Sequence, residues 1–237
     1  MEAGTAKNVE TLIETLKGNR FSPVEFVGDR GAAADLVLGM IPLEATVGAP
    51  GSTTVRQLGI VARLRERGTA VVDPLVPSDL PVEEVHRQSL RADVLLASSN
   101  ALTLDGKLVN IDGVGNRVGG MIFGPRKVIL VIGTNKIVRD VNEALDRIKN
   151  VIAPYHARTK GRRTPCATKG YCTDCRSPER MCNVTTIIEK KPRLTDVAIV
   201  LVGEDLGLAW QPDWPEARRE RIAAAYRETR IGYRSGL

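Results

Sequence analysis

The sequence predicts an α/β fold with a mainly parallel sheet flanked by helices. Short apolar runs alternate with segments of helical periodicity along most of the chain, as in consecutive βαβ units. The runs "DVLLAS" and "KVILVIG" are apolar without alternation, which indicates strands buried on both faces. A length of 237 residues allows one large core, so we expect a single domain over residues 1–237.

The composition is typical of a globular protein. Hydrophobic residues make up 43% and charged residues 26%, while the aromatic fraction of 4% leaves the core to Val, Ile, Leu and Ala. No run of about 18 apolar residues is present, and the N-terminal segment lacks the order of a signal peptide. We therefore expect a cytoplasmic protein without a membrane partner.

The net charge of +6 raises the question of nucleic-acid binding. The excess is local, because residues 158–163 ("RTKGRR") and 218–234 carry much of it. A solvated basic face explains such a pattern without a nucleic-acid site, which remains the lesser alternative.

The first half of the chain is justified element by element. Val9, Leu12, Ile13 and Leu16 have helical spacing and predict a helix that ends near Gly18. The sequence then predicts an extended run over residues 21–28, a helix stopped by Pro42, and alternating strands and helices: strand 43–48, helix 54–67, strand 69–73, helix 82–90 and strand 92–99.

The second half begins with a predicted hairpin, because Asp105-Gly106 separates two alternating runs. The clearest strand follows over Lys127–Gly133, and a helix is expected from just after Thr134 and Asn135, with apolar positions from Ile137 to Ile152. The remaining elements are strands in "VTTIIEK" and "DVAIVLVGED", and a charged helix over residues 215–230 within a C-terminal extension, residues 208–237.

A glycine- and hydroxyl-rich turn follows the strand at residues 43–48. Glycines allow a ligand to approach the backbone, and N–H groups at a helix start attract a phosphate or carboxylate. An ordinary helix cap by Ser52 or Thr53 explains the same turn equally well. The candidate anion-binding residues here are Gly48, Gly51, Ser52, Thr53 and Thr54.

A second polar stretch follows the buried strand "DVLLAS". Ligands of open α/β sheets bind beyond the carboxyl ends of strands, although Asp-Gly and Gly-Asn pairs also serve tight turns. Two such turns around one hairpin favour a ligand site. The candidate residues are Ser99, Asn100, Asp105, Gly106, Asp112, Gly113, Gly115, Asn116 and Arg117.

All four cysteines lie in one polar segment with the spacing C-x5-C-x2-C-x6-C: Cys166, Cys172, Cys175 and Cys182. Disulfides are disfavoured in a cytosolic protein, and two bridges closing short loops would stabilise a chain of this size little. A redox dithiol is also disfavoured, because "CTDC" does not follow a strand at a helix start. We expect metal ligation by this cysteine loop, residues 156–183.

The spacing favours a 4Fe-4S cluster over zinc. Structural zinc commonly uses two C-x-x-C pairs, whereas only Cys172 and Cys175 form one here. A continuous loop of thiolates suits a cubane cluster, and Lys169, Arg176 and Arg180 would offset its negative charge. The spacing is the reverse of the cluster loop in endonuclease III-like glycosylases. Zinc remains the alternative.

The chain contains two histidines, His86 and His156. His86 falls in a predicted helix and His156 in the basic approach to the cysteines. Both are expected at the surface, with His156 close enough in sequence to support the metal site. No Ser, His and Asp set can be assigned, so catalytic residues are not predicted.

These motifs together resemble the LUD-domain, or lactate-utilisation, family. The resemblance covers most of residues 5–207, including "VGAPGSTTVRQLG", "SSNALTLDGKLVNIDGVGNRVGG" and the cysteine loop, which is similar to that of a cysteine-bearing branch. It implies a fold like that of the NagB, ribose-5-phosphate isomerase and CoA-transferase superfamily. It also implies that the protein acts together with iron–sulfur partner proteins in the oxidation of lactate to pyruvate.

The sequence departs from CoA-transferases in one respect. Residues 94–132 contain no Glu, and Leu104 stands where relatives often place an acidic residue, so acyl-glutamyl chemistry is disfavoured. We therefore expect a redox or sulfur-handling protein, as an iron–sulfur oxidoreductase component, with a small carboxylate or phosphorylated ligand. An electron-transfer partner and a homo-oligomer are compatible with it. The alternative is a non-redox binding or isomerase-like protein with structural zinc.

Overall fold

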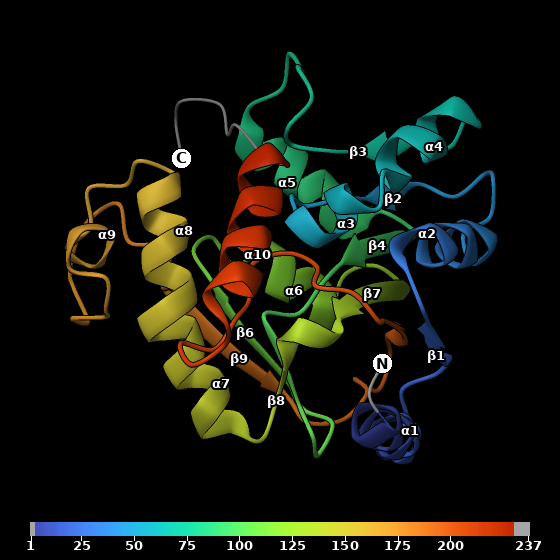
Figure 1. Cartoon of the computed structure of the whole chain (residues 1–237). Coiled ribbons are helices and arrows are strands. Elements are labelled where there is room, and N and C mark those ends of the chain that lie inside the picture. Colours follow the sequence, from blue (N-terminus) through green and yellow to red (C-terminus); the bar gives the residue numbers. More distant parts are fainter. Residues whose placement is uncertain (1–2, 230–237) are drawn as a thin grey trace.

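Six parallel strands form the main sheet of the computed structural model, which describes residues 3–229 (Figure 1). Every pairing in this sheet is parallel, as the apolar runs predict. The mainly parallel α/β fold is thereby confirmed. In spatial order the strands are β1 (Val24–Val27), β10 (Asp196–Val202), β7 (Lys127–Gly133), β4 (Val94–Ala97), β2 (Val47–Gly48) and β3 (Val71–Val72).

The central strands are buried on both faces. In β4, Val94 and Leu96 belong to one hydrophobic core, whereas Leu95 and Ala97 belong to the other. This alternation arises because successive strand side chains point to opposite faces. The first core is covered by α2 (Arg30–Gly39), α3 (Thr53–Gln57) and α4 (Ile60–Glu66); the second by α1 (Ala3–Gly18) and α6 (Asn116–Ile122).

A second sheet of four strands packs beside the second core. It contains the predicted hairpin, in which Ala101 pairs with Val109 and Gly106 has a φ of +79° in the turn. The two outer strands of this sheet pair with the hairpin: one follows β7 in the chain and the other follows the cysteines. These pairings join distant segments and carry no local sequence signal. The order is β8 (Ile137–Val138), β5 (Ala101–Thr103), β6 (Leu108–Asp112) and β9 (Val184–Ile188).

The helix expected over residues 54–67 is two helices. Gly59 has a left-handed φ of +67° between α3 and α4, and this conformation ends the helical hydrogen-bond pattern. As a result α3 has five residues.

The helix expected from just after Asn135 begins later. A 3₁₀ turn, η1 (Thr134–Lys136), and β8 come first, and Asp140 then caps α7 (Val141–Arg147) by accepting a 2.9 Å hydrogen bond from the Glu143 N–H. The helical segment continues through a π-helical turn, η2 (Ile148–Ile152), into α8 (Ala153–Thr159). The apolar pattern from Ile137 to Ile152 therefore spans a strand and two helical segments.

The C-terminal helix is α10 (Glu216–Glu228), and it lies beside α8 in Figure 1. Its residues Ile222 and Tyr226 pack with Ile152 and Trp210 in a small apolar cluster. The expected end of this helix at residue 230 and the extension to residue 237 lie outside the described residues. No helix among residues 3–229 is long and apolar enough to span a bilayer.

Candidate functional site

A cavity of about 260 Å³ opens at the carboxyl ends of the parallel strands. Its wall combines the segments that follow β2, β4, β7 and β10 with the end of β6, which is where α/β folds bind ligands. Ten of the fourteen predicted ligand residues line it: Gly51, Ser52, Thr53, Thr54, Ser99, Asn100, Asp112, Gly113, Asn116 and Arg117.

The four other predicted residues do not line this cavity. Gly48 is in β2, where an added Cβ would lie 2.7 Å from the Ser89 carbonyl oxygen, so its role is close packing. Asp105 and Gly106 form the hairpin turn against the end of α1, where the Asp105 carbonyl accepts from Asn19 at 3.1 Å. Gly115 starts α6 with a φ of +91°.

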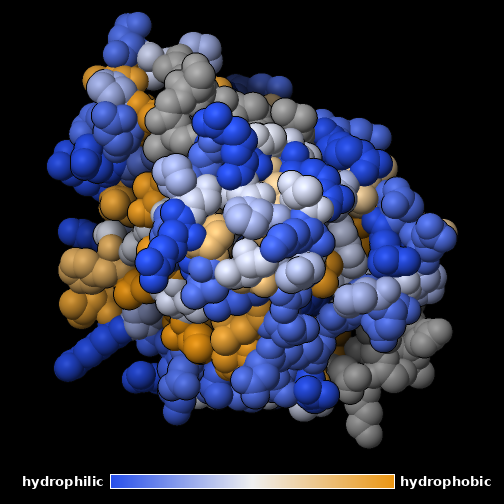
Figure 2. Space-filling model, turned by 90° about the vertical axis from the view of Figure 1, so that its left-hand side faces the viewer, coloured by the Kyte–Doolittle hydropathy of each residue, from blue (hydrophilic) through white to orange (hydrophobic). Residues whose placement is uncertain are grey.

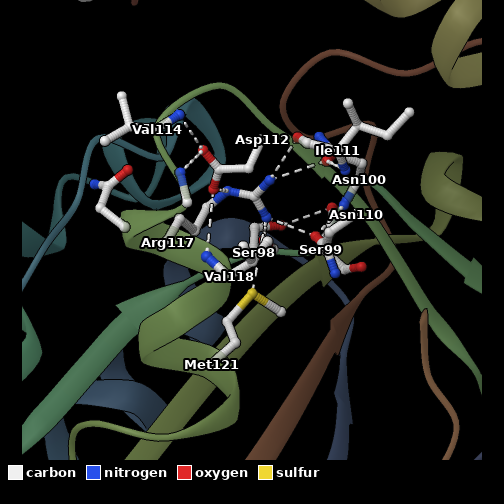
Figure 3. A network of polar contacts seen from close by, with 12 residues as sticks. Ser98, Ser99, Asn100, Asn110, Ile111, Asp112, Val114, Arg117, Val118 and Met121 are labelled. Atoms are coloured by element: carbon white, nitrogen blue, oxygen red, sulfur yellow. Dashed lines mark hydrogen bonds and ion pairs between the residues drawn. The ribbon is translucent and has the colours of Figure 1, made fainter. Parts of the chain in front are cut away.

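Arg117 ties the strand ends together (Figure 3). Its guanidinium group donates to Asn100 Oδ1 at 3.0 Å and to the carbonyl oxygens of Ser98 and Ile111 at 3.1 and 3.0 Å. Asp112 lies 3.7 Å from Arg117 Nε and balances its charge. Arg117 therefore acts first as a clamp between β4 and β6.

Asp112 shapes the turn between β6 and α6. Its carboxylate accepts hydrogen bonds from the N–H groups of Val114, Gly115 and Val118 at 3.1–3.3 Å. These bonds and the Arg117 contact occupy the carboxylate. The glycine-rich turn therefore holds Asp112 in place and presents Gly113 to the cavity.

The turn after β2 is built largely by helix capping. Ser52 accepts from the Val55 N–H at 3.4 Å as the cap of α3, which is the role that an ordinary turn predicts. Because α3 has five residues, its start offers little of the dipole on which the predicted anion site depends. Thr54 differs from the capping residue Ser52, because its hydroxyl oxygen accepts a hydrogen bond from a lysine.

That lysine is Lys136, which was not predicted as a site residue. It ends η1 directly after the central strand, and its side chain lines the cavity although the residue is only 5% exposed. Its Nζ donates to Thr54 Oγ1 at 2.7 Å, to Ser98 Oγ at 2.8 Å and to the Ser99 carbonyl at 3.1 Å. Burial, together with the positive charges of Arg117 and Arg147, lowers the pKa of Lys136 to about 7.

Both histidines also line the cavity, so the expectation of surface histidines is wrong. His86 is 5% exposed and its Nδ1 lies 2.9 Å from the Asn116 amide nitrogen; burial lowers its pKa, and the Asp112 charge opposes this. His156 Nδ1 is hydrogen bonded to the Tyr226 hydroxyl. Burial and nearby cations lower the pKa of His156 to about 4, so the ring is neutral at physiological pH.

The cysteine loop reaches the cavity from another side. Met181 and Arg162 line the wall, and the Asn183 N–H donates to the Asp112 carbonyl at 3.0 Å. The backbone of Met181 lies beside Gly113, where an added Cβ would be at an ordinary van der Waals distance of 3.4 Å from it. The residue before Cys182 therefore lies next to the turn that follows β6.

The four cysteines are free and half-buried, on α9 (Pro165–Lys169) and the irregular segment after it. Burial raises the pKa of Cys182; Arg180 opposes this shift and the other three cysteines add to it, so the four sulfurs are electrostatically coupled. Among residues 3–229, no three His, Cys, Asp or Glu side chains are arranged as a metal-binding group. This side of the molecule is largely hydrophilic (Figure 2).

One turn of the loop carries a hydrogen bond to sulfur. Between Cys172 and Cys175, Asp174 adopts a φ of +45° and donates its N–H to Cys172 Sγ at 3.4 Å. Arg180 crosses the loop and donates to the Cys175 carbonyl at 2.6 Å. Hydrogen bonds to sulfur stabilise thiolate ligands, and such bonds tune both zinc and iron–sulfur sites.

The model of the LUD domain matches residues 9–202. The chain belongs to the LUD-domain family. This LUD-domain chain matches no curated protein. Among solved structures it is similar to a DUF162 family protein from Deinococcus radiodurans, with 14% identity, a TM-score of 0.49 and coverage of 84% of this chain and 98% of that chain. It is also similar to ribose 5-phosphate isomerase A from Methanocaldococcus jannaschii, with 12% identity, a TM-score of 0.32 and coverage of 48% and 56%.

Proposed function

We propose that this LUD-domain protein is a redox or sulfur-handling protein of organic-acid metabolism. In this proposal it binds a small carboxylate or phosphorylated ligand in the strand-end cavity, and its four cysteines hold a 4Fe-4S cluster. The observation that carries the proposal is the shared wall: Met181, next to Cys182, and Gly113, next to Asp112, lie beside each other at the same cavity.

The charges and hydrogen-bond donors of the cavity support an anionic ligand. The Ile111 N–H donates to Asn100 Oδ1, which fixes the amide and leaves its NH₂ group as the side available to a ligand. Lys136 and Arg162 add positive charge, and the Asp112 carboxylate is already engaged by Arg117 and three backbone N–H groups. Donors and positive charge match the acceptor oxygens of a carboxylate or phosphate.

The chemistry of the cysteine loop supports a cluster. Four thiols from one short segment give the all-sulfur ligand set that iron–sulfur clusters use, and the Asp174 N–H already donates to one sulfur. Arg180 supplies a nearby positive charge. When bound, such a cluster would accept and donate single electrons, and its place on a hydrophilic face would suit contact with an electron-transfer protein.

The family is linked to lactate utilisation, so L-lactate and pyruvate are the first ligands to test. Both are small and carry one carboxylate, which fits a cavity of about 260 Å³. Inorganic phosphate tests the phosphorylated class. Calorimetric binding by any of the three supports the proposal, whereas the absence of binding by all of them contradicts its ligand half.

Anaerobic reconstitution with iron and sulfide tests the cluster. A broad absorption band near about 400 nm that bleaches with dithionite is expected, and it should be lost in Cys172→Ser and Cys175→Ser. Pro178→Ala, an exposed change in the same loop that leaves all four thiols in place, is the control. Colourless protein that binds about one zinc ion would instead support the non-redox alternative, to which the Cys172–Cys175 pair is also suited.

A further inference from the structure

Lys136 occupies a rigid position in the cavity wall. It follows the central strand β7, and the buried Arg147 donates to the carbonyl oxygens of Asn135 and Lys136 at 3.1 and 2.8 Å. Asn135 is itself fully buried and donates to the Ala209 carbonyl at 3.0 Å. The backbone that carries the Lys136 side chain is therefore held from two sides.

The ammonium group of Lys136 has an acceptor for each of its N–H groups, but its charge is not balanced by a carboxylate. Its three N–H groups meet three neutral oxygens, from Thr54, Ser98 and Ser99. No carboxylate within residues 3–229 forms an ion pair with it. An unpaired buried cation is costly, and it attracts any anion that can enter the cavity.

The lysine also sets the direction of the Thr54 hydroxyl group. Because Thr54 Oγ1 accepts from the ammonium group, its own O–H is left to donate, whereas the Ser98 hydroxyl donates to the Ser99 carbonyl at 3.4 Å. Thr54 lines the cavity. A bound carboxylate or phosphate can therefore receive a hydrogen bond from a hydroxyl that a positive charge has polarised.

Gly207 keeps the space beside this group open. It has a φ of +69°, and a Cβ there would lie 2.4 Å from Thr54 Oγ1 and 3.1 Å from Lys136 Nζ. A side chain at position 207 would displace the lysine or the threonine. The absence of a side chain at position 207 thus leaves room for the Lys136 ammonium group and the Thr54 hydroxyl.

We propose that Lys136 is the residue that recognises the negative charge of the ligand, and that an anion binds with uptake of a proton by Lys136. This inference rests on the proposed function, since it assigns the charge partner of the same anionic ligand. The ligand class is a small anion with acceptor oxygens, either a carboxylate or a phosphate.

The other charged groups around the cavity are not the site of this proton uptake near neutral pH. Arg117 from α6 and Arg147 from α7 act on Lys136 electrostatically and remain charged, while the pKa values of His86 and His156 are lowered by burial. The pKa of Lys136 is about 7, so half of the free protein carries a neutral amine at that pH. A bound anion raises this pKa by favouring the ammonium form.

The test is calorimetry of the full chain with pyruvate, L-lactate and inorganic phosphate at pH 6 and pH 8.5, in buffers of different ionisation enthalpy. The protonated fraction of an amine with a pKa near 7 falls from about 0.9 to about 0.03 over this range. The affinity for pyruvate and L-lactate, whose own charge does not change over this range, should therefore fall about 30-fold. At pH 8.5 the wild-type protein should take up close to one proton for each anion bound. The comparison of pyruvate with phosphate distinguishes the two ligand sources.

Two variants separate recognition from a structural role. Lys136→Met should weaken binding at pH 6 at least about tenfold and remove proton uptake, because it lacks the charge. Lys136→Arg should bind equally well at pH 6 and pH 8.5 without proton uptake, because arginine stays charged. Lys190→Met, which changes an exposed lysine in the same way, should behave as the wild type.

Wild-type binding that is independent of pH and takes up no proton would overturn this inference while leaving the proposed function in place. Anion binding by Lys136→Met with the affinity of the wild type would also overturn this inference and leave the proposed function in place. If the wild type binds none of the three probes at either pH, the ligand half of the proposed function fails, and this inference fails with it.

Discussion

At the scale of single residues, the polar residues that follow the buried strands could be predicted from the sequence. The residues from other elements that join them at the cavity could not. The positions from Gly51 to Thr54 and from Ser99 to Arg117 stand next to buried apolar runs, which is a local signal. Lys136 carries a weaker signal of the same kind, since it follows "KVILVIG" by three residues. His86 and Tyr226 carry none, because only tertiary packing brings α5 (Val82–Arg91) and α10 to the cavity.

Arg117 shows why a predicted site residue is not always a ligand residue. Its guanidinium group contacts the protein itself, including Asn100, Asn110 and Asp112. Removing a largely buried, paired cation costs roughly 3–5 kcal/mol of unfolding free energy. A loss of ligand binding in Arg117→Ala would therefore report on the clamp, and Lys136 is the better residue for testing recognition.

The burial of Lys136 makes stability depend on pH even without a ligand. Its pKa falls from 10.5 to about 7 on folding, so the unfolded chain holds the extra proton between these values. The free energy of unfolding therefore rises with pH over this range, and the full cost of burying the charge is present below pH 7. Lys136→Met should raise the thermal midpoint at pH 6, and this gain should shrink at pH 9.

Thermal unfolding of Lys136→Met and of the exposed control Lys190→Met at both pH values measures this difference. The control should differ little from the wild type at either pH. An equal effect of Lys136→Met at pH 6 and pH 9 would show that the amine does not change its protonation state in this range.

At the scale of secondary structure, elements with strong local signals were predicted, whereas the short strand β8 was not. The hairpin around Gly106 and the strand β7 are confirmed close to their expected bounds. The expected helix from residue 137 was wrong at its start, because Ile137 pairs with Leu102 in the second sheet. Apolar periodicity cannot distinguish a helix from a short strand that precedes it in the same phase.

In addition to the apolar contacts of Ile222 and Tyr226, an arginine joins the helix α10 to the segment that follows β10. The Arg218 guanidinium lies 3.7 Å from the centre of the Trp214 ring and 2.7 Å from the Asp205 carboxylate. These contacts sum to roughly 1–2 kcal/mol. Arg218→Ala should therefore speed hydrogen exchange of the α10 amides about tenfold and leave β7 unchanged.

Arg221→Ala is the matched control for this experiment. Arg221 is on the same helix and also approaches Asp205, but at 3.5 Å and with a side chain that is 70% exposed. Its loss should change exchange in α10 by less than about twofold. Equal acceleration in the two variants would contradict the assignment of Arg218 as the stronger of the two polar contacts with Asp205.

At the scale of the whole molecule, two parts that are far apart in sequence meet at one cavity. The segments that follow the parallel strands supply donors, and the cysteine loop supplies Met181 and Arg162. The sequence predicts each part separately. Their contact depends on β9 pairing with β6, which leads residues 181–183 onto the Asp112 turn and has no local signal.

Cofactor binding should stabilise the molecule as a whole if the cysteines hold a cluster. A group that binds the folded chain more tightly than the unfolded chain raises the thermal midpoint by mass action. Anaerobic reconstitution with iron and sulfide should therefore raise the midpoint of the wild type. A variant with all four cysteines changed to serine should show no such rise, and an equal rise in that variant would exclude the cysteines as ligands.

The position of Gly207, Leu208 and Tyr226 in the chain has a consequence for biosynthesis. These residues form part of the cavity wall, yet they follow the last strand of the main sheet. During translation the earlier segments are made first. Until residues 207–226 are synthesised, the cavity wall lacks Gly207, Leu208 and Tyr226, and Lys136 lacks the backbone of Gly207 beside it. The cavity is therefore completed only after every strand of the main sheet has been made.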